Sequence, residues 1–309
     1  MLNKHASNFV RFYSFLELHQ STMLTQPIIS TQYNYSEFAP ANGVPTGVGC
    51  ISAGFKDIAR GFVVWPLWVM LGTSDIRERY RRSTLGPFWI TISMAVFILF
   101  IGFIYSRIFK IEVAFYIPFV SSGLIIWGFI SGSISEATGS FKEGTRVIRQ
   151  LRHPFSLYVL RTLTRLVIIL AHTAVLMPIV WVVFGISLST NMLLVFPGMA
   201  LVFLNQFWVA IVIAVLATRF SDVVQIVSSA IQISMFATPI MWPLSVISDH
   251  RFIADFNPLY HLIQLVRMPM LGQAPEVLSW IVVLGMNGAG YLFAAWLLGR
   301  VRHRIVYWL

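Results

Sequence analysis

Four arginines form the densest charged group in this sequence. They fall within six residues of the stretch DIRERYRRSTLGPFW, just before a long apolar run: Arg77, Arg79, Arg81 and Arg82. In a helix Arg77 and Arg81 share one face, so the group, here called the arginine ridge, forms a basic surface at the depth of the lipid headgroups. Such a surface can hold anionic phosphates. The alternative is that these arginines only anchor and orient the first membrane-spanning helix.

The sequence offers little for catalysis or metal binding. Cys50 is the only cysteine, and the seven histidines occur without HExxH or CxxC spacing, so we expect no metal site. Consecutive residues such as Ser248, Asp249 and His250 do not form a catalytic triad. Glu136 is the nearest candidate for a catalytic acid, but it is a lone carboxylate. The phosphate-binding pattern G-x-x-x-x-G-K-[ST] is missing, so we expect this chain to bind no cofactor and no ATP.

Composition points to lipid as the main solvent. Of 309 residues, 57% are hydrophobic and 11% are charged, and the mean hydropathy is +0.75. These values are beyond the range of soluble domains. The formal net charge is +10, but the basic residues lie at the edges of apolar runs rather than on a face suited to nucleic acid.

Membrane-crossing segments can be placed by length. A helix that crosses about 30 Å of hydrocarbon needs about 20 mostly apolar residues. Six runs are long enough: 87 to 105, 113 to 134, 166 to 184, 192 to 217, 223 to 242 and 277 to 298. Two shorter runs, 62 to 71 and 256 to 271, are expected to lie at an interface or to re-enter partway. The predicted class is an all-α integral membrane protein with six transmembrane helices.

The distribution of basic residues predicts the orientation. Cytoplasmic segments carry an excess of Lys and Arg, and counting alternate segments puts 18 of the 22 basic residues on one side and four on the other. Both termini are therefore expected in the cytoplasm. Residues 1 to 54 lack the pattern of a signal peptide, and we expect a poorly ordered cytoplasmic extension before a transmembrane domain of residues 55 to 309.

Two of the predicted spans carry side chains that could line a pathway. The fifth has a polar stripe at helical spacing, made of Gln225, Ser228, Ser229 and Gln232. Polar side chains are costly against lipid, so this stripe faces either a wet pathway or neighbouring helices that it binds. The first span has aromatic residues near one face, Trp89, Phe97 and Phe100, which either stack on sugar rings or only pack.

Two segments outside the spans have their own patterns. The basic segment 141 to 156 carries Lys142, Glu143, Arg146, Arg149 and Arg152 in a short helix ended by Pro154; it is either a docking surface or a solvated loop. On the other side, Asn257 followed by Pro258 is a typical helix start. An apolar stripe follows, made of Leu259, Leu262, Ile263 and Val266. This helix is too short to span and suits a gate or an interfacial helix.

The order of these features resembles a known transporter family. The arginine-rich run followed by Leu85-Gly86-Pro87 and Trp89, the segment FKEGTRVIRQLRHPFS, and the later TPIMWP and NPLYHLIQLVR are similar to the permease subunit of type 2 ABC exporters. Within that family the closest resemblance is to the branch that exports lipid-linked O-antigen or capsular polysaccharide. The resemblance covers about residues 55 to 300.

The resemblance implies a role for most of these segments. Residues 55 to 75 would form a cytoplasmic interface helix, residues 141 to 156 would dock on a separate ATP-binding subunit that holds ATP and Mg, and residues 257 to 271 would close the outer end. Two copies of the chain would pair in the bacterial cytoplasmic membrane, with the first and fifth spans facing the channel. The arginine ridge would attract the phosphate or pyrophosphate that links lipid to sugar.

Two other functions compete with this interpretation. An exporter of drugs or small lipids would share the fold but favour a drier and narrower pathway than the polar stripe indicates. A membrane enzyme acting on lipid-linked sugar would need positioned acids, bases or a nucleophile. The predicted spans contain almost none.

Overall fold

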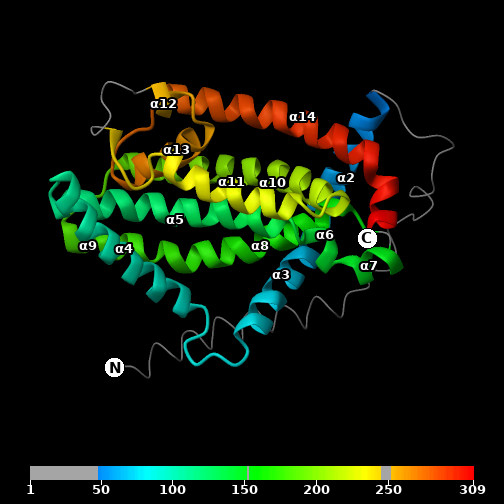
Figure 1. The fold of residues 1–309 in the computed structure, drawn as a ribbon, viewed down its shortest axis with the longest axis horizontal. Helices are drawn as coiled ribbons and strands as arrows, with labels where there is room; N and C mark the ends of the chain where they lie inside the picture. The colour runs from blue at the N-terminus through cyan, green and yellow to red at the C-terminus, as the bar shows by residue number, and fades with distance from the viewer. Residues whose placement is uncertain (1–47, 152, 245–251) are drawn as a thin grey trace. The chain divides into compact units, whose positions relative to one another are not determined.

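The computed structural model describes residues 48–151, 153–244 and 252–309. Regular structure in these ranges is helical throughout, which confirms the all-α class (Figure 1). The first half contains α2 (Val48–Val63), α3 (Trp65–Tyr80), α4 (Phe88–Phe109), α5 (Val113–Ala137), α6 (Ser140–Glu143) and α7 (Thr145–Gln150). The second half contains α8 (Phe155–Ala174), α9 (Leu176–Phe184), the 3-10 helix η2 (Thr190–Leu194), α10 (Val195–Arg219), α11 (Val223–Ala237), α12 (Phe252–Asp255), α13 (Pro258–Met270) and α14 (Val277–Trp308).

Five helices are long and apolar enough to cross a membrane. They are α4, α5, α14, the continuous pair α8–α9 (Phe155–Phe184) and the pair η2–α10 (Thr190–Arg219). The fifth predicted span, 223 to 242, is helical only as far as Ala237, over 15 residues. A helix of that length rises about 22 Å, less than the hydrocarbon thickness. It ends there because Thr238 precedes a proline and adopts an extended conformation.

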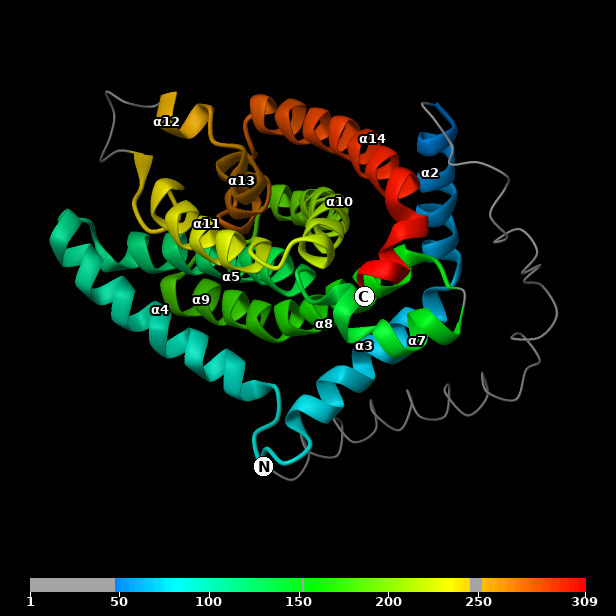
Figure 2. The same cartoon turned by 45° about the vertical axis from the view of Figure 1, so that its right-hand side comes forward.

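The long helices lie beside one another between two ends that differ in chemistry (Figure 2). We call the end that contains α6, α7 and the last turns of α14 the basic end, because exposed Lys and Arg side chains gather there. The opposite end contains α12, α13 and the start of α5.

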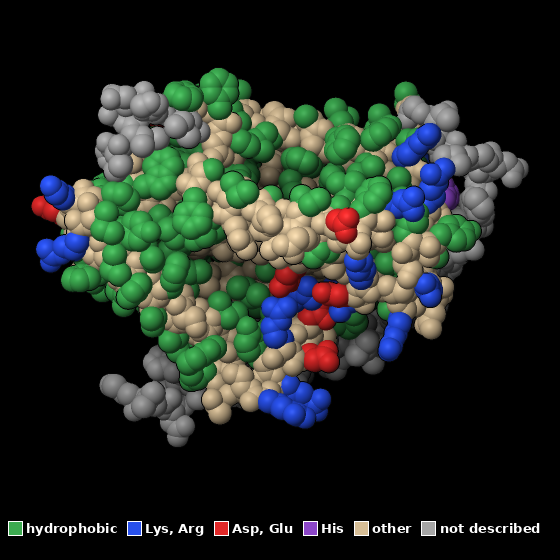
Figure 3. Space-filling view, in the orientation of Figure 1, with side chains coloured by type: hydrophobic (Ala, Val, Ile, Leu, Met, Phe, Trp, Pro, Cys, Tyr) green, Lys and Arg blue, Asp and Glu red, His purple; other side chains and the backbone are tan. Residues whose placement is uncertain are grey.

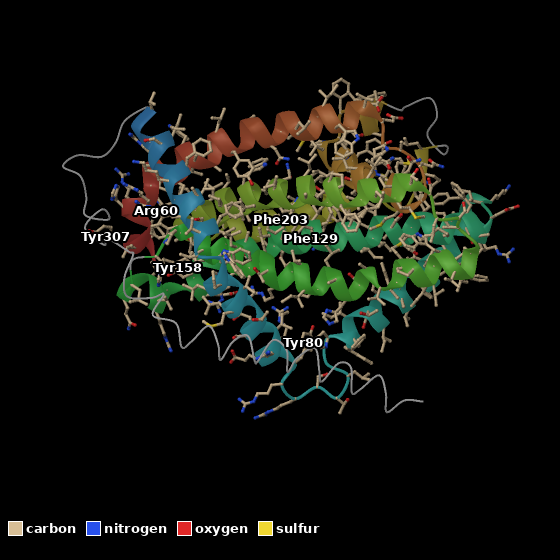
Figure 4. The ribbon with its side chains drawn as sticks, turned by 180° about the vertical axis from the view of Figure 1, so that it is seen from behind. Arg60, Tyr80, Phe129, Tyr158, Phe203 and Tyr307 are labelled. Carbon is tan, nitrogen blue, oxygen red and sulfur yellow. The ribbon has the colours of Figure 1, made fainter. Side chains whose placement is uncertain are left out.

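The apolar core forms around α5 and α10. Phe129 of α5 is buried, and Phe203 of α10 packs beside it between the long helices (Figure 4). Tyr158 of α8 belongs to a second buried cluster nearer the basic end, whereas Tyr307 of α14 points away from the bundle and is exposed.

The segment before the first span forms two helices rather than one. The predicted interface helix, 55 to 75, is divided at Val64, and Pro66 lies in the first turn of α3. Residues 1–47 of the predicted extension lie outside the described residues, and residues 48–54 already belong to α2. Here α2 packs closely on α14, since a Cβ atom on Gly54 would collide with the carbonyl group of Ala295.

Candidate functional site

Six charged side chains from four helices meet between α3 and the start of α8. This group, called the ion cluster, contains Asp75 and Arg79 of α3, Glu136 of α5, Glu143 of α6, and Arg161 and Arg165 of α8. Figure 3 shows acidic and basic side chains side by side on this part of the surface. Three arginines and three carboxylates balance, so the cluster as a whole is neutral.

Arg165 lies at the centre of the ion cluster and is only 5% exposed. Its Nε donates to Oε2 of Glu136 at 2.8 Å. Its Nη1 donates to Oδ2 of Asp75 at 3.2 Å and to Oε2 of Glu143 at 3.1 Å. One buried guanidinium therefore binds a carboxylate from each of α3, α5 and α6.

A second arginine on α8 binds the same acid on α3. Nε of Arg161 donates to Oδ2 of Asp75 at 2.8 Å, and its Nη2 donates to Oδ1 at 2.6 Å. This bidentate geometry is the strongest form of an arginine–carboxylate pair. Asp75 is thus shared by Arg161 and Arg165, which fixes α3 against the first half of α8.

The ion cluster was not predicted from the sequence. Glu136 was interpreted as a lone carboxylate, and that was wrong, because it pairs with Arg165 and also with Nη2 of Arg79 at 3.3 Å. Arg161 and Arg165 lie four positions apart in one helix, on the same face. This spacing was the one local feature of the sequence that indicated a charged site here. Their acidic partners on α3 and α5 lie 29 to 90 positions away in the sequence.

The arginine ridge is interrupted rather than continuous. Helix α3 ends at Tyr80, so Arg81 and Arg82 lie in the turn that follows. A pocket of about 430 Å³ is lined by Glu78, Arg79, Arg81 and Arg82; we call it the basic pocket. Its lining residues do not include Arg77, which lies in the last turn of α3.

The basic pocket has the chemistry of an anion site. Its lining contains three arginines and one glutamate, and guanidinium groups bind phosphate oxygens in a bidentate geometry. Its volume falls within the range of small-ligand sites. Because Arg79 also binds Glu136, the basic pocket and the ion cluster share a residue.

The basic segment 141 to 156 forms two short helices, α6 and α7, joined at Gly144. Phe141 and Ile148 are buried, while Lys142, Arg146 and Arg149 are exposed. Glu143 differs from the other charged residues, because its carboxylate pairs with Arg165 in the ion cluster. Arg152 lies outside the described residues.

A buried acid on α2 holds the start of α8. Oδ2 of Asp57 accepts from the backbone N–H of Phe155 at 3.1 Å, and its Oδ1 accepts from that of Ser156 at 3.0 Å. Burial raises the pKa of Asp57 above its ordinary value, although hydrogen bonds from Ser156 and Phe155 act in the opposite direction. The carboxylate occupies the N-terminus of α8, where the helix dipole favours a negative charge.

The residues predicted to line a pathway lie on the chain's exposed faces. Exposed side chains on α4 include Trp89, Phe97 and Phe100. The polar stripe on α11 is also exposed, at Gln225, Ser228, Ser229 and Gln232. Both helices pack against α5. The structure therefore leaves both sets available to a partner, a pathway or lipid.

The predicted helix start at Asn257 is confirmed. Oδ1 of Asn257 accepts from the backbone N–H of Leu259 at 3.0 Å, and Pro258 is the first residue of α13. The predicted apolar stripe is mostly buried, at Leu262, Ile263 and Val266, with Leu259 partly exposed. Most of α13 is enclosed by α5, α10 and α14, so it is not an interfacial helix lying on the surface.

Comparison with known proteins identifies a family. The model of the family described as ABC-2 type transporter matches residues 66–271. A protein of Klebsiella pneumoniae called O-antigen export system permease protein RfbA is 24% identical over 205 residues, covering 65% of this chain and 78% of its own length. A protein of the same name from Myxococcus xanthus is 24% identical over 205 residues, covering 63% of this chain and 76% of its own.

Proposed function

Because the chain belongs to the ABC-2 type transporter family, we propose that it is the transmembrane subunit of an ATP-driven exporter of lipid-linked polysaccharide. The family and the long apolar helices make it a multi-pass permease of the bacterial inner membrane. The substrate proposal draws on the relatives named O-antigen export permeases and on the basic pocket.

The observation that carries the proposal is that the ion cluster and the basic pocket share Arg79. Through Glu143 the cluster reaches α6, and through Asp75 and Arg79 it reaches α3. A displacement of α6 therefore acts on α3 through Arg165, which binds both Glu143 and Asp75. This is the connection that an exporter needs between its energy source and its substrate site.

The energy source is proposed to be a separate ATP-binding subunit. It docks at the basic end, on the exposed Lys142, Arg146 and Arg149, through an acidic surface of its own. ATP and Mg bind to that subunit. The excess of basic residues at this end agrees with a cytoplasmic location for both α6 and the C-terminus.

The substrate is proposed to enter at the basic pocket. A phosphate or pyrophosphate between lipid and sugar carries the negative charge that Arg79, Arg81 and Arg82 complement. The lipid remains in the bilayer beside α4, and the sugar chain passes between two copies of the permease. The exposed polar stripe of α11 and the exposed aromatic side chains of α4 border that path.

Affinity purification from solubilised membranes tests the energy source. We expect an ATP-binding subunit to co-purify at a one-to-one ratio and to be identified by mass spectrometry. If the chain is recovered alone, or with glycosyltransferases, across several detergents, the proposed exporter has no energy source. In that case a membrane enzyme acting on lipid-linked sugar becomes the better hypothesis.

The substrate needs its own test, because a drug or small-lipid exporter would co-purify with the same kind of partner. The ATPase activity of the purified complex should rise with added lipid-linked polysaccharide. Stimulation by apolar drugs, with no response to lipid-linked polysaccharide, would favour the alternative substrate class.

A further inference from the structure

Arg267 of α13 is a buried cation at the opposite end of the bundle from the ion cluster. Its side chain is 1% exposed, and its guanidinium carbon lies 4.2 Å from the ring centroid of Phe119. Nη1 donates to the carbonyl oxygen of Pro239 at 2.8 Å, and Nη2 donates to that of Ile240 at 3.0 Å. Within the described ranges no acidic side chain forms an ion pair with it.

The surroundings of Arg267 are shaped to accept a cation. A Cβ atom on Gly123, one turn after Phe119 on α5, would collide with the guanidinium group. A buried charge without a counter-ion is costly. The aromatic face offsets part of that cost, and so do the carbonyl groups just beyond α11, where the helix dipole is negative.

These carbonyl groups belong to the turn that follows α11, residues 238–241, which we call the strap. Besides its bonds to Arg267, the strap accepts a hydrogen bond at the Met241 carbonyl from the hydroxyl of Tyr116. Nδ2 of Asn257 donates to Oγ1 of Thr238 at 3.0 Å and to the carbonyl oxygen of Ala237 at 3.3 Å. The strap is therefore held by polar side chains of α5, α13 and the residue that caps α13.

Helix α11 ends at this strap. Each of its residues, Val223–Ala237, is at least partly exposed. Its contact with the core is made by partly buried side chains, Ile231 and Met235. The strap that continues from its end is buried instead, at Thr238, Ile240 and Met241. The fully buried attachment of this part of the chain is thus at the strap and not within α11.

We propose that Arg267 is a positioning residue for export: by binding the strap it fixes the direction of α11, and with it the direction in which the polar stripe faces. This inference rests on the proposed function, in which the polar stripe borders the path of the sugar chain. Loss of the guanidinium leaves two buried carbonyl oxygens without donors. The equilibrium between the strap bound in its present position and the strap released from it should then shift by roughly tenfold or more.

Spin labels report the direction of α11 without any transport assay. Cysteines at Ser228 of α11 and at Leu292 of α14 replace exposed residues, and the chain without them gives the baseline, since Cys50 is fully buried. Pulsed electron paramagnetic resonance on labelled chain diluted with unlabelled chain then gives the distance within one copy. We expect Arg267→Met to shift and broaden this distance, and Arg267→Lys to do so less.

A second route displaces the guanidinium without removing it. Gly123→Ala places a methyl group where Arg267 lies, and Tyr116→Phe removes only the hydroxyl donor to Met241; both should change the distance in the same direction. Arg107→Met is the matched control, because Arg107 also lies over a ring, that of Phe103 at 5.5 Å, but is exposed. An unchanged distance in Arg267→Met and Gly123→Ala overturns the proposal. If Arg267→Met does not fold, an unchanged distance in both Gly123→Ala and Tyr116→Phe overturns it.

Export by the same variants separates this inference from the proposed function. Arg267→Met should lower export by about tenfold, in line with the shift in the strap, and Arg267→Lys should lower it less, while the ATP-binding partner co-purifies as before with both variants. Unchanged export together with a changed distance would show that the direction of α11 does not serve export. Absence of ATP-dependent export by the unsubstituted chain would refute the proposed function, and the distance measurement would still decide the role of Arg267 in the fold.

Discussion

Arg165 of α8 and Glu136 of α5 are joined by a hydrogen bond of 2.8 Å between Nε and Oε2. The same guanidinium also binds Asp75 of α3 and Glu143 of α6. Two membrane-crossing helices, the helix before the first span and the segment proposed to dock the ATPase therefore meet at one side chain.

Removing one acid from this cluster should uncouple the exporter. Glu136→Gln leaves Arg165 buried with one fewer counter-ion, and breaking a buried pair costs about 3–5 kcal/mol, less where the acid is partly exposed. We expect export to fall at least about tenfold, with unchanged amounts of partner on the purified chain. Asp222→Asn, at an exposed acid before α11, is the control and should export normally. Normal export by Glu136→Gln would show that the cluster is not part of the coupling.

The pair of Asp75 and Arg161 allows a quantitative test of the same cluster. A double-mutant cycle with Asp75→Asn and Arg161→Gln, measured by thermal unfolding in detergent, should give a coupling free energy of about 0.5–3 kcal/mol. A coupling near zero would mean that the contact between α3 and α8 does not contribute to stability.

The arginine ridge distinguishes substrate binding from membrane anchoring. Replacing Arg79, Arg81 and Arg82 with glutamine removes the positive charge of the basic pocket, so export should be lost while membrane insertion and topology are retained. Lysine at the same positions keeps the charge and should restore part of the export. Inverted topology or failed insertion in the glutamine variant would instead support the anchoring interpretation.

The exposed basic residues of α6 and α7 should determine binding of the ATPase. Reversing the charge at Lys142, Arg146 and Arg149 places like charges against an acidic partner, which lowers the association rate and reduces or reverses the weakening of binding by salt. Co-purification at rising salt concentration measures this effect. Lys56→Glu changes an exposed charge on α2 and serves as the control. Equal recovery of partner with all four variants would place the docking surface elsewhere.

The buried carboxylate of Asp57 should give the fold a specific pH dependence. Burial raises the pKa of Asp57 above 3.8, so the folded protein binds its proton more tightly than the unfolded chain. The contribution of this group to stability is then largest at low pH and declines as the pH rises through the raised pKa. Thermal unfolding of the chain and of Asp57→Asn across this range should show a difference that changes in that direction. If the difference in stability between the two proteins does not change with pH, burial does not raise the pKa of this carboxyl group.

The sequence allows two interpretations of the polar stripe of α11: it faces a wet pathway, or it binds neighbouring helices. Substitution distinguishes them. Leucine at Gln225 and Gln232 makes the face apolar, so a wet pathway would lose export while the protein assembles normally. If the stripe only binds neighbouring helices, the same variant should lose assembly, which size-exclusion chromatography in detergent would detect.

Long apolar runs predicted most of the fold because lipid imposes length and composition on any helix that crosses it. This held for α4, α5, α10 and α14, and the cap at Asn257 was also correctly predicted, since the cap residue and the proline after it are adjacent in sequence. The run from 223 to 242 failed because its hydropathy continues through Thr238 and Pro239, whereas the backbone leaves the helix at Ala237.

The candidate site was predicted only in part, for a physical reason. Charge density alone identified Arg79, Arg81 and Arg82. The pairing of Arg165 with Glu136 joins helices 29 positions apart, and that with Asp75 joins helices 90 positions apart; both depend on how α3, α5 and α8 pack. Arg267 was counted only as a charge on the outer side, because its acceptors are backbone carbonyl groups, which no sequence pattern marks.

The most direct test of the central claim is ATP-dependent movement of the substrate in inverted membrane vesicles. Vesicles that contain the permease, its co-purifying ATPase and a lipid-linked polysaccharide are treated with a glycosidase that cannot cross the membrane. The proposal predicts that ATP protects the polysaccharide by moving it into the vesicle, and that Glu136→Gln abolishes this protection. Equal degradation with and without ATP in vesicles with the unsubstituted chain would contradict the claim that it is an ATP-driven polysaccharide exporter.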